Sequence, residues 1–119
     1  MRETLQAKRD GAAARLAMGA ASYGLGVPFE EISALRRGTA AAALARQVAM
    51  YLCHVVFELS LSRIALAFGR DRSTVAHACH AIEDRRDAAE FDAWIGALEA
   101  MLRRAPSLEH PYWAPEARP

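Results

Sequence analysis

Apolar side chains recur along this chain every three or four positions and almost never alternate with polar ones, which is the period of an amphipathic helix. Gly24 and Gly26 end the first periodic stretch, and Val27-Pro28 begins the next, because proline suits a first helical turn. Thr39 and Ser60 are placed to cap two later stretches. The pattern predicts helices over Glu3–Tyr23, Pro28–Leu35, Ala40–Glu58, a short stretch between Ser60 and Gly69, a stretch beginning near Asp71, and Ala88–Arg104.

The same periodicity predicts how the side chains face. The first helix carries on one side Leu5, Ala12, Leu16, Ala20 and Tyr23, and the second buries Phe29, Ile32 and Leu35. The third has a stripe of Leu44, Val48, Leu52, Val55 and Leu59, whereas the residues toward its other faces are Arg46, Gln47, Met50 and His54. The last three helices are built on Ile64, Ala65 and Phe68, on Val75, Ala78, Cys79 and Ile82, and on Phe91, Trp94, Ile95, Leu98 and Leu102. We expect an all-α fold, a compact bundle of about six helices.

Length and composition fit one helical domain. The chain has 119 residues, of which 53% are hydrophobic and 27 are alanine, the strongest helix former. Four of the five prolines follow residue 105. We therefore expect a helical domain over residues 1–104 and a proline-rich, disordered tail over residues 105–119.

Several classes of protein are excluded by what the sequence lacks. It has no GxxxxGK[ST] loop and no GxGxxG motif, so no phosphate-cradling nucleotide site is expected. Cys53 and Cys79 indicate reduced thiols in a cytosolic protein rather than a disulfide scaffold. The N-terminus lacks the apolar region of a signal peptide, and the most apolar window, Thr39–Phe57, contains Arg46. We expect a cytoplasmic protein with no membrane partner.

Positive charge is concentrated in the middle of the chain. The net charge is +1, but residues 35–86 contain eight arginines and only four acids, whereas residues 87–119 contain three arginines and six acids. This distribution suggests one basic surface. Charge alone leaves open a solvated helical face with no partner.

The segment after Leu61 has the spacing of a helix-turn-helix. Ile64 and Phe68 lie one turn apart on its first helix, and Gly69 allows the sharp turn that follows. Its second helix then presents, away from the apolar stripe, Arg72, Ser73, Thr74, Ala76, His77 and His80. Arginine and hydroxyl side chains at a helix N-terminus suit the major groove, where they bond to base edges and phosphates. The spacing alone is also compatible with two ordinary packed helices.

The same part of the chain carries the motifs of a known family. Residues Ala45–Glu83 contain RQ-x-AMYL, LSL-x-x-I-x-x-x-FG and RD-x-[ST]-TV-x-HAC. This set resembles the C-terminal DNA-binding domain of the bacterial chromosomal replication initiator, DnaA. The segment YGLGVPFEEISALRR (Tyr23–Arg37) is similar to the family segment that leads to a basic loop. The resemblance covers roughly residues 10–103 and leaves out the ATPase module that precedes this domain in the full initiator.

The resemblance implies a set of DNA contacts. The recognition helix and the turn before it would approach bases and nearby phosphates in the major groove through Arg70, Asp71, Arg72, Ser73 and Thr74, with His77 near the backbone. Phosphates would also be touched by Leu61 and Ser62, and on the other side by Arg46 and Gln47. The start of the basic loop, which in the family enters the minor groove, matches Arg36 and Arg37.

The sequence departs from the family pattern at three places. The usual FGGRDH is one glycine shorter here, which predicts a tighter turn or a slightly rotated recognition helix. Arg72 stands where the family has histidine. Gly38-Thr39 and a run of alanines replace arginines of the basic loop, and we expect these alanines to extend the third helix backwards.

Other chemistry has little support in the sequence. His77, Cys79 and His80 lie within four residues, but Cys79 turns inward and no further cluster completes a tetrahedral metal site. No serine or cysteine nucleophile has a base beside it, so we expect neither an enzyme nor a cofactor or metal.

The sequence thus predicts a regulatory protein that binds double-stranded DNA at initiator-type boxes, in replication initiation or transcription, and is associated with the nucleoid. The alternative is a protein-interaction module that binds the replication initiator or another regulator and has little DNA binding of its own. The acidic last helix and Tyr112-Trp113 could serve that purpose. Formation of a homodimer also stays open.

Overall fold

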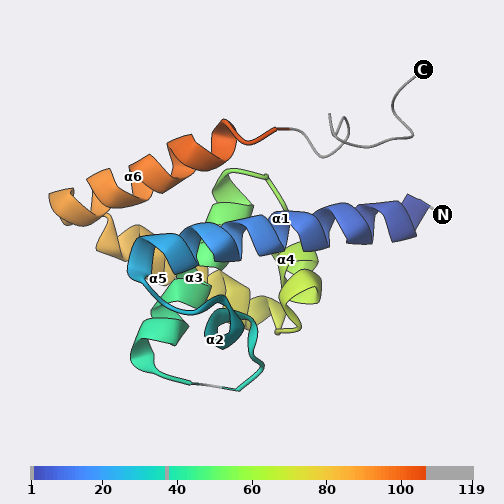
Figure 1. Ribbon diagram of the computed structural model, residues 1–119. Helices are drawn as coiled ribbons and strands as arrows, with labels where there is room; N and C mark the ends of the chain where they lie inside the picture. Colours follow the sequence, from blue (N-terminus) through green and yellow to red (C-terminus); the bar gives the residue numbers. More distant parts are fainter. Residues whose placement is uncertain (1, 37, 107–119) are drawn as a thin grey trace.

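The computed structural model describes residues 2–36 and 38–106, and within these ranges the chain forms helices and no strand (Figure 1). The helices are α1 (Arg2–Leu25), α2 (Phe29–Ser33), α3 (Ala40–Val55), α4 (Leu61–Phe68), α5 (Arg72–Arg85) and α6 (Ala89–Arg103). The predicted all-α bundle of about six helices is therefore confirmed. Arg37 and the predicted tail from residue 107 onward, with Tyr112 and Trp113, lie outside the described residues.

Side-chain caps begin α3 and α4 where the sequence places them. The hydroxyl of Thr39 accepts a hydrogen bond from the amide of Ala42 (3.0 Å), and the hydroxyl of Ser60 accepts one from the amide of Arg63 (3.2 Å). Because α3 starts at Ala40, the alanine run does extend this helix backwards, as predicted. The segment between α2 and α3 is short as a result.

The C-terminal end of α3 is set by a local break rather than by the hydrophobic pattern. α3 stops at Val55, earlier than the predicted end at Glu58. Glu58 has a left-handed φ of 56°, which no helix accommodates. Nδ1 of His54 donates to the carbonyl oxygen of Leu59 (2.9 Å) and holds the chain as it turns toward α4.

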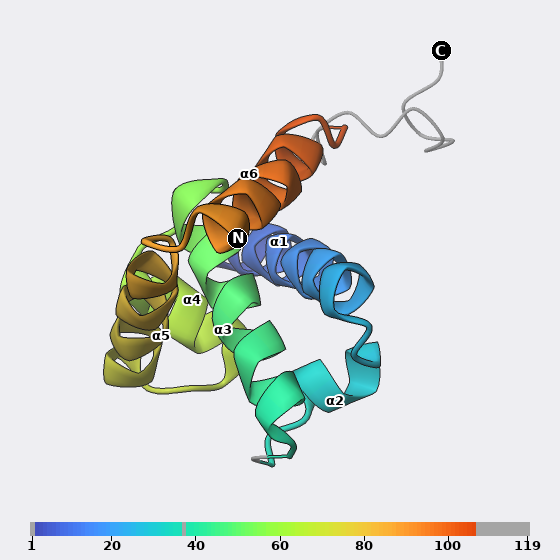
Figure 2. The same ribbon diagram turned by 90° about the vertical axis from the view of Figure 1, so that its left-hand side faces the viewer.

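α3 is the central helix, and α1, α2, α4 and α5 all pack against it (Figure 2). Its predicted stripe is buried at Val48 and Leu52. Met50 and Arg46, predicted to lie toward other faces, are also buried, because those faces are covered by neighbouring helices. Amphipathic periodicity underestimates burial for a helix that is surrounded.

α1 and α3 pack against each other, and many of their buried residues are alanines. The buried residues of α1 include Ala13, Ala14, Ala17 and Ala21, and those of α3 include Ala42, Ala45 and Ala49. By contrast, Leu5, Leu16 and Tyr23, which the sequence places on one side of the first helix, are exposed. The core face of α1 is thus its alanine face, and we call this contact the alanine seam. The first turns of α1 extend past the other helices (Figure 1).

The predicted burial of the second helix is correct in part. Ile32 is fully buried and Phe29 is half-buried, but Leu35 is 74% exposed, so that part of the prediction is wrong. α2 ends at Ser33, and Ala34 is extended with ψ at 143°. The extended residue rotates Leu35 off the buried face of the helix.

α6 is joined to the body by its predicted apolar residues, by a hydrogen bond from Arg103 to the carbonyl oxygen of Val55 (3.2 Å) and by the bonds of Arg86. Ile95, Leu98 and Leu102 are buried. Arg86, at the end of α5, donates through Nε to Asp92 (2.6 Å) and through Nη1 to Glu99 (2.7 Å) and to the hydroxyl of Tyr51 (2.9 Å). These hydrogen bonds raise the pKa of Arg86, since each favours the charged guanidinium.

A second ion pair joins α1 to α4. Asp10 is buried and accepts two hydrogen bonds from Arg63, at 3.0 Å from Nε and 2.7 Å from Nη2. The bidentate geometry fixes the first helix of the helix-turn-helix against α1.

No helix within the described ranges combines the length and the apolar character needed to span a bilayer.

Candidate nucleic-acid interface

α4 and α5 form the helix-turn-helix, and three residues, Gly69 to Asp71, connect them. Gly69 has a left-handed φ of 65°, and the amide of Arg70 donates back to the carbonyl oxygen of Ala65 (2.9 Å). This is the pattern of a helix that ends at a left-handed glycine. One glycine therefore suffices for this turn, although the family pattern has two at this place.

The first turn of α5 is open to solvent on the side away from the core. Val75, Ala78, Cys79 and Ile82 are buried, as predicted. The exposed residues are Asp71, Arg72, Ser73, Thr74 and His77. Asp71 precedes the helix but makes no side-chain capping bond to it. The amides of the first turn thus carry the positive end of the helix dipole toward solvent, beside one guanidinium and two hydroxyl groups.

α4 contributes its own residues next to this turn. Ser62 is exposed and Leu61 is half-buried. Leu66, which was not singled out in the sequence, is 81% exposed and borders a shallow hollow together with Ser62 and Arg72. The sequence alone could have identified Leu66 as an exposed apolar residue, because it falls outside the stripe of Ile64 and Phe68.

Arg46 lies in a different environment from the one expected of a phosphate contact. Its residue surface is only 8% exposed. Its Nε donates to the carbonyl oxygen of Ile32 (2.9 Å) and its Nη2 to that of Glu31 (2.9 Å). Burial and the nearby charge of Arg70 both lower the pKa of Arg46. This guanidinium caps the C-terminal end of α2, while Gln47 beside it is half-buried.

Arg70 also bonds within the protein. Its Nη2 donates to the carbonyl oxygen of Ala34 (2.9 Å), just after α2. The hydrogen bond connects the turn of the helix-turn-helix to the segment between α2 and α3. Figure 2 shows this segment and the α4–α5 turn at the same lower edge of the molecule.

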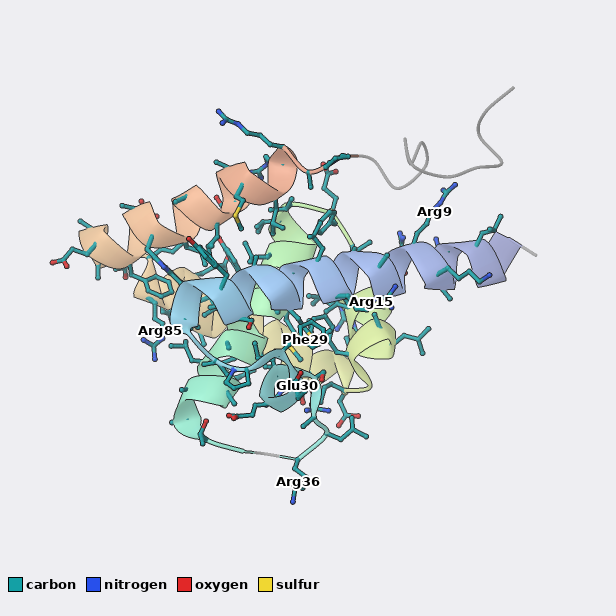
Figure 3. The ribbon with its side chains drawn as sticks, viewed as in Figure 1. Arg9, Arg15, Phe29, Glu30, Arg36 and Arg85 are labelled. Atoms are coloured by element: carbon teal, nitrogen blue, oxygen red, sulfur yellow. The ribbon has the colours of Figure 1, made fainter. Side chains whose placement is uncertain are left out.

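Arg36 is exposed, and its side chain points away from the body of the molecule in Figure 3. It lies two residues after Ala34, in the stretch that corresponds to the start of the predicted basic loop. The structure therefore brings Arg36 and the first turn of α5 to one end of the bundle, whereas it turns Arg46 inward.

The cysteines and histidines do not gather into a reactive site. His77 and His80 are exposed and Cys79 is buried, so the thiol points away from the two imidazoles. Burial raises the pKa of the Cys53 thiol to about 12 and that of Cys79 to about 11. In the part of the chain that the structure describes, no three ligand-type side chains lie together as a metal site would need.

Residues 20–82 match the family model of the bacterial DnaA protein helix-turn-helix. The chain belongs to this family. The matched region begins near the end of α1 and ends at residue 82, within α5, so it includes the open first turn and the segment after α2.

Individual relatives agree with the family. The chain is 38% identical over 63 residues to the chromosomal replication initiator protein DnaA of Tropheryma whipplei, both in strain Twist and in strain TW08/27. That region is 51% of this chain and 13% of each relative, so the chain matches a small part of the initiator. A crystal structure of a DNA replication initiation factor superposes on it with a TM-score of 0.71 and 30% sequence identity, over 81% of this chain and 30% of that one.

Proposed function

We propose that this domain binds double-stranded DNA with α5 in the major groove. The observation that carries the proposal is the first turn of α5, where Arg72, Ser73 and Thr74 are exposed at an uncapped helix N-terminus. The hydroxyls would meet base edges and the threonine methyl a thymine methyl, while the open amides would bond to a phosphate. Membership in the DnaA helix-turn-helix family supports this orientation.

The other proposed DNA contacts are made by exposed side chains near α5. Ser62 of α4 and His77 of α5 would approach the DNA backbone, and Asp71 would lie at the edge of the groove. Arg36 would reach the neighbouring minor groove from the segment between α2 and α3, together with Arg37. With Arg36, Arg37 and Arg72 as the arginines at the DNA surface, the logarithm of the binding constant would fall with a slope of about −2.7 against the logarithm of salt concentration.

The role that we propose is regulatory and does not involve catalysis. The chain would act in the cytoplasm, at the nucleoid, by occupying initiator-type boxes in replication initiation or transcription. This role is supported by the match of residues 20–82 to the helix-turn-helix family of the bacterial DnaA protein.

Fluorescence anisotropy with a duplex that carries an initiator-type box, against a scrambled duplex, tests this proposal over a salt series. We expect selective binding with the slope given above. Thr74→Ala should cost about 1–3 kcal/mol on the box and relax the preference at one or two base pairs. Arg104→Ala, an exposed arginine at the far end of α6, is the control and should bind like the wild type. Equal loss on both duplexes with Thr74→Ala would contradict base recognition.

The second candidate is binding to another protein, and one surface favours it. Exposed Leu16 and Tyr23 of α1 and Met101 of α6 line a common groove, and exposed apolar side chains of this kind are typical of interaction sites. The partner would be the replication initiator, another regulator or a second copy of this chain. This candidate would be favoured over the first if the protein bound no duplex at low salt, and if light scattering showed a complex with one of these partners that Tyr23→Ser abolishes.

A further inference from the structure

The C-terminal end of α2 is held between two arginines that come from distant parts of the chain. Arg46 of α3 bonds to the carbonyl oxygens of Glu31 and Ile32, and Arg70 of the α4–α5 turn bonds to that of Ala34. The last carbonyl groups of a helix have no partner within the helix and carry the negative end of its dipole, so cations are stabilised there. We call this arrangement the arginine clasp.

An apolar contact lies beside the clasp. A Cβ atom built on Gly69 would stand 3.5 Å from Cδ2 of Leu35, so the Leu35 side chain rests over the turn at that glycine. The rest of Leu35 faces solvent, which leaves this contact one-sided. The start of the segment between α2 and α3 is therefore joined to the helix-turn-helix by the Arg70 hydrogen bond, and the Leu35 side chain lies beside the turn.

The opposite end of that segment is also fixed, because Thr39 caps α3. Four residues, 35 to 38, lie between the carbonyl group held by Arg70 and the cap. Arg36 is the second residue of this short span, and Arg72 follows Arg70 by two positions. The backbone at Arg36 and the first turn of α5 are thus tied together across a few covalent bonds and one hydrogen bond.

We propose that Arg70 and Leu35 are positioning residues that make Arg36 and the first turn of α5 act on DNA as one unit. The proposal rests on the DNA binding proposed above and deepens it. In this arrangement Arg70 acts through the segment that it holds and does not contribute a phosphate contact. Its half-buried guanidinium is committed to the Ala34 carbonyl, close to the charge of Arg46.

A double-mutant cycle on the box duplex separates positioning from direct contact. Arg70→Ala should weaken binding about five- to tenfold, and Arg36→Ala should weaken it by a similar factor; both should lower the salt slope to the same extent, because each removes the contribution of Arg36. In the Arg70→Ala background, Arg36→Ala should then cost less than about twofold, because an arginine that is no longer held in place contributes little. Additive losses, with a salt slope that falls further in the double variant than in either single variant, would show that Arg70 contacts a phosphate itself and overturn the inference.

Two further variants guard against loss of fold and provide a matched control. Leu35→Ala weakens the same junction without removing a charge, so it should also be non-additive with Arg36→Ala, and adding Arg36→Ala to it should lower the salt slope no further. Arg72→Ala, an exposed arginine on the proposed DNA surface, should lower the slope by about one. Additive behaviour of Leu35→Ala would count against positioning even if Arg70→Ala does not fold.

Amide hydrogen exchange without DNA distinguishes failure of this inference from failure of the proposed function. The amide of Ala34 donates to the carbonyl oxygen of Glu30 at the end of α2 (3.1 Å), so it reports on the clasp directly. It should exchange faster in Arg70→Ala and in Leu35→Ala than in the wild type. Unchanged exchange overturns the inference whether or not the chain binds DNA. Faster exchange in a protein that binds no duplex would confirm that the clasp holds this segment, but would overturn the proposed function and with it the effect on DNA.

Discussion

Replacing Arg46 by methionine tests whether this arginine stabilises the fold or binds DNA. The substitution keeps the unbranched apolar stem and removes the donors, so the carbonyl oxygens of Glu31 and Ile32 lose their partners. Because the arginine is buried, water reaches these oxygens poorly after the change. We expect the free energy of unfolding to fall.

The magnitude follows from the two hydrogen bonds. A bond from a charged donor contributes about 1.5–3 kcal/mol, so the pair would contribute roughly 3–6 kcal/mol. Burial of the guanidinium offsets part of this, as the lowered pKa of Arg46 indicates. A net loss of about 2–3 kcal/mol corresponds to a fall in Tm of roughly 10–20 °C for a domain of this size.

Thermal unfolding followed by circular dichroism measures the loss, and anisotropy on a duplex below the Tm measures DNA binding. Arg46→Met should have a lower Tm, and its salt slope should equal that of the wild type. Arg72→Met is the matched control, because that arginine is exposed: its Tm should stay near the wild-type value while its salt slope falls by about one. A Tm of Arg46→Met within about 3 °C of the wild type, with a slope reduced by one, would refute the structural role.

Three further outcomes are expected. Gly69→Ala should lose about 1–2 kcal/mol of stability because its φ is left-handed, whereas Gly19→Ala, within α1 and with open space around the added methyl group, should gain about 0.5–1 kcal/mol in urea unfolding. Arg86→Ala should lower the free energy of unfolding by about 2–3 kcal/mol and speed amide exchange in α6. Its exposed neighbour is the control: Arg85→Ala should lower the free energy of unfolding by less than about 1 kcal/mol, and equal losses would count against the role of the Arg86 bonds. Cys53 should resist a thiol reagent at pH 8 until the protein unfolds, and rapid labelling of the native protein would contradict its burial. Because the pKa of this thiol is raised to about 12 in the folded protein, the free energy of unfolding should fall as the pH rises above about 9, the ordinary pKa of a thiol.

The helix-turn-helix could be predicted from the sequence because its signals are local. The stripe of Val75, Ala78 and Ile82, the glycine at the turn and the cap at Ser60 each act within a few residues. The open first turn of α5 follows from the same periodicity, since whatever lies off the stripe faces solvent unless another helix covers it.

What the sequence could not predict depends on contacts between distant segments. Arg46 looks like a surface arginine in the helical pattern, and only the position of α2 gives it two carbonyl partners. Leu35 looks like a core residue until the extended backbone at Ala34 turns it outward. In α1, larger side chains such as Leu16 look like core residues in the sequence, although the buried residues are mostly alanines.

The alanine seam also limits how far relatives of this chain can diverge. Alanine has no side-chain rotamers to lose on folding, so α1 and α3 come together without the entropy cost that leucine or methionine would add. Both larger and smaller side chains in the alanine seam would destabilise the fold. A larger residue at Ala17 or Ala49 would overpack it by about 1–3 kcal/mol, and glycine would weaken either helix by about 1 kcal/mol. We therefore expect sequence drift in this lineage to accumulate on the exposed side of α1, while the seam positions stay within the smallest side chains.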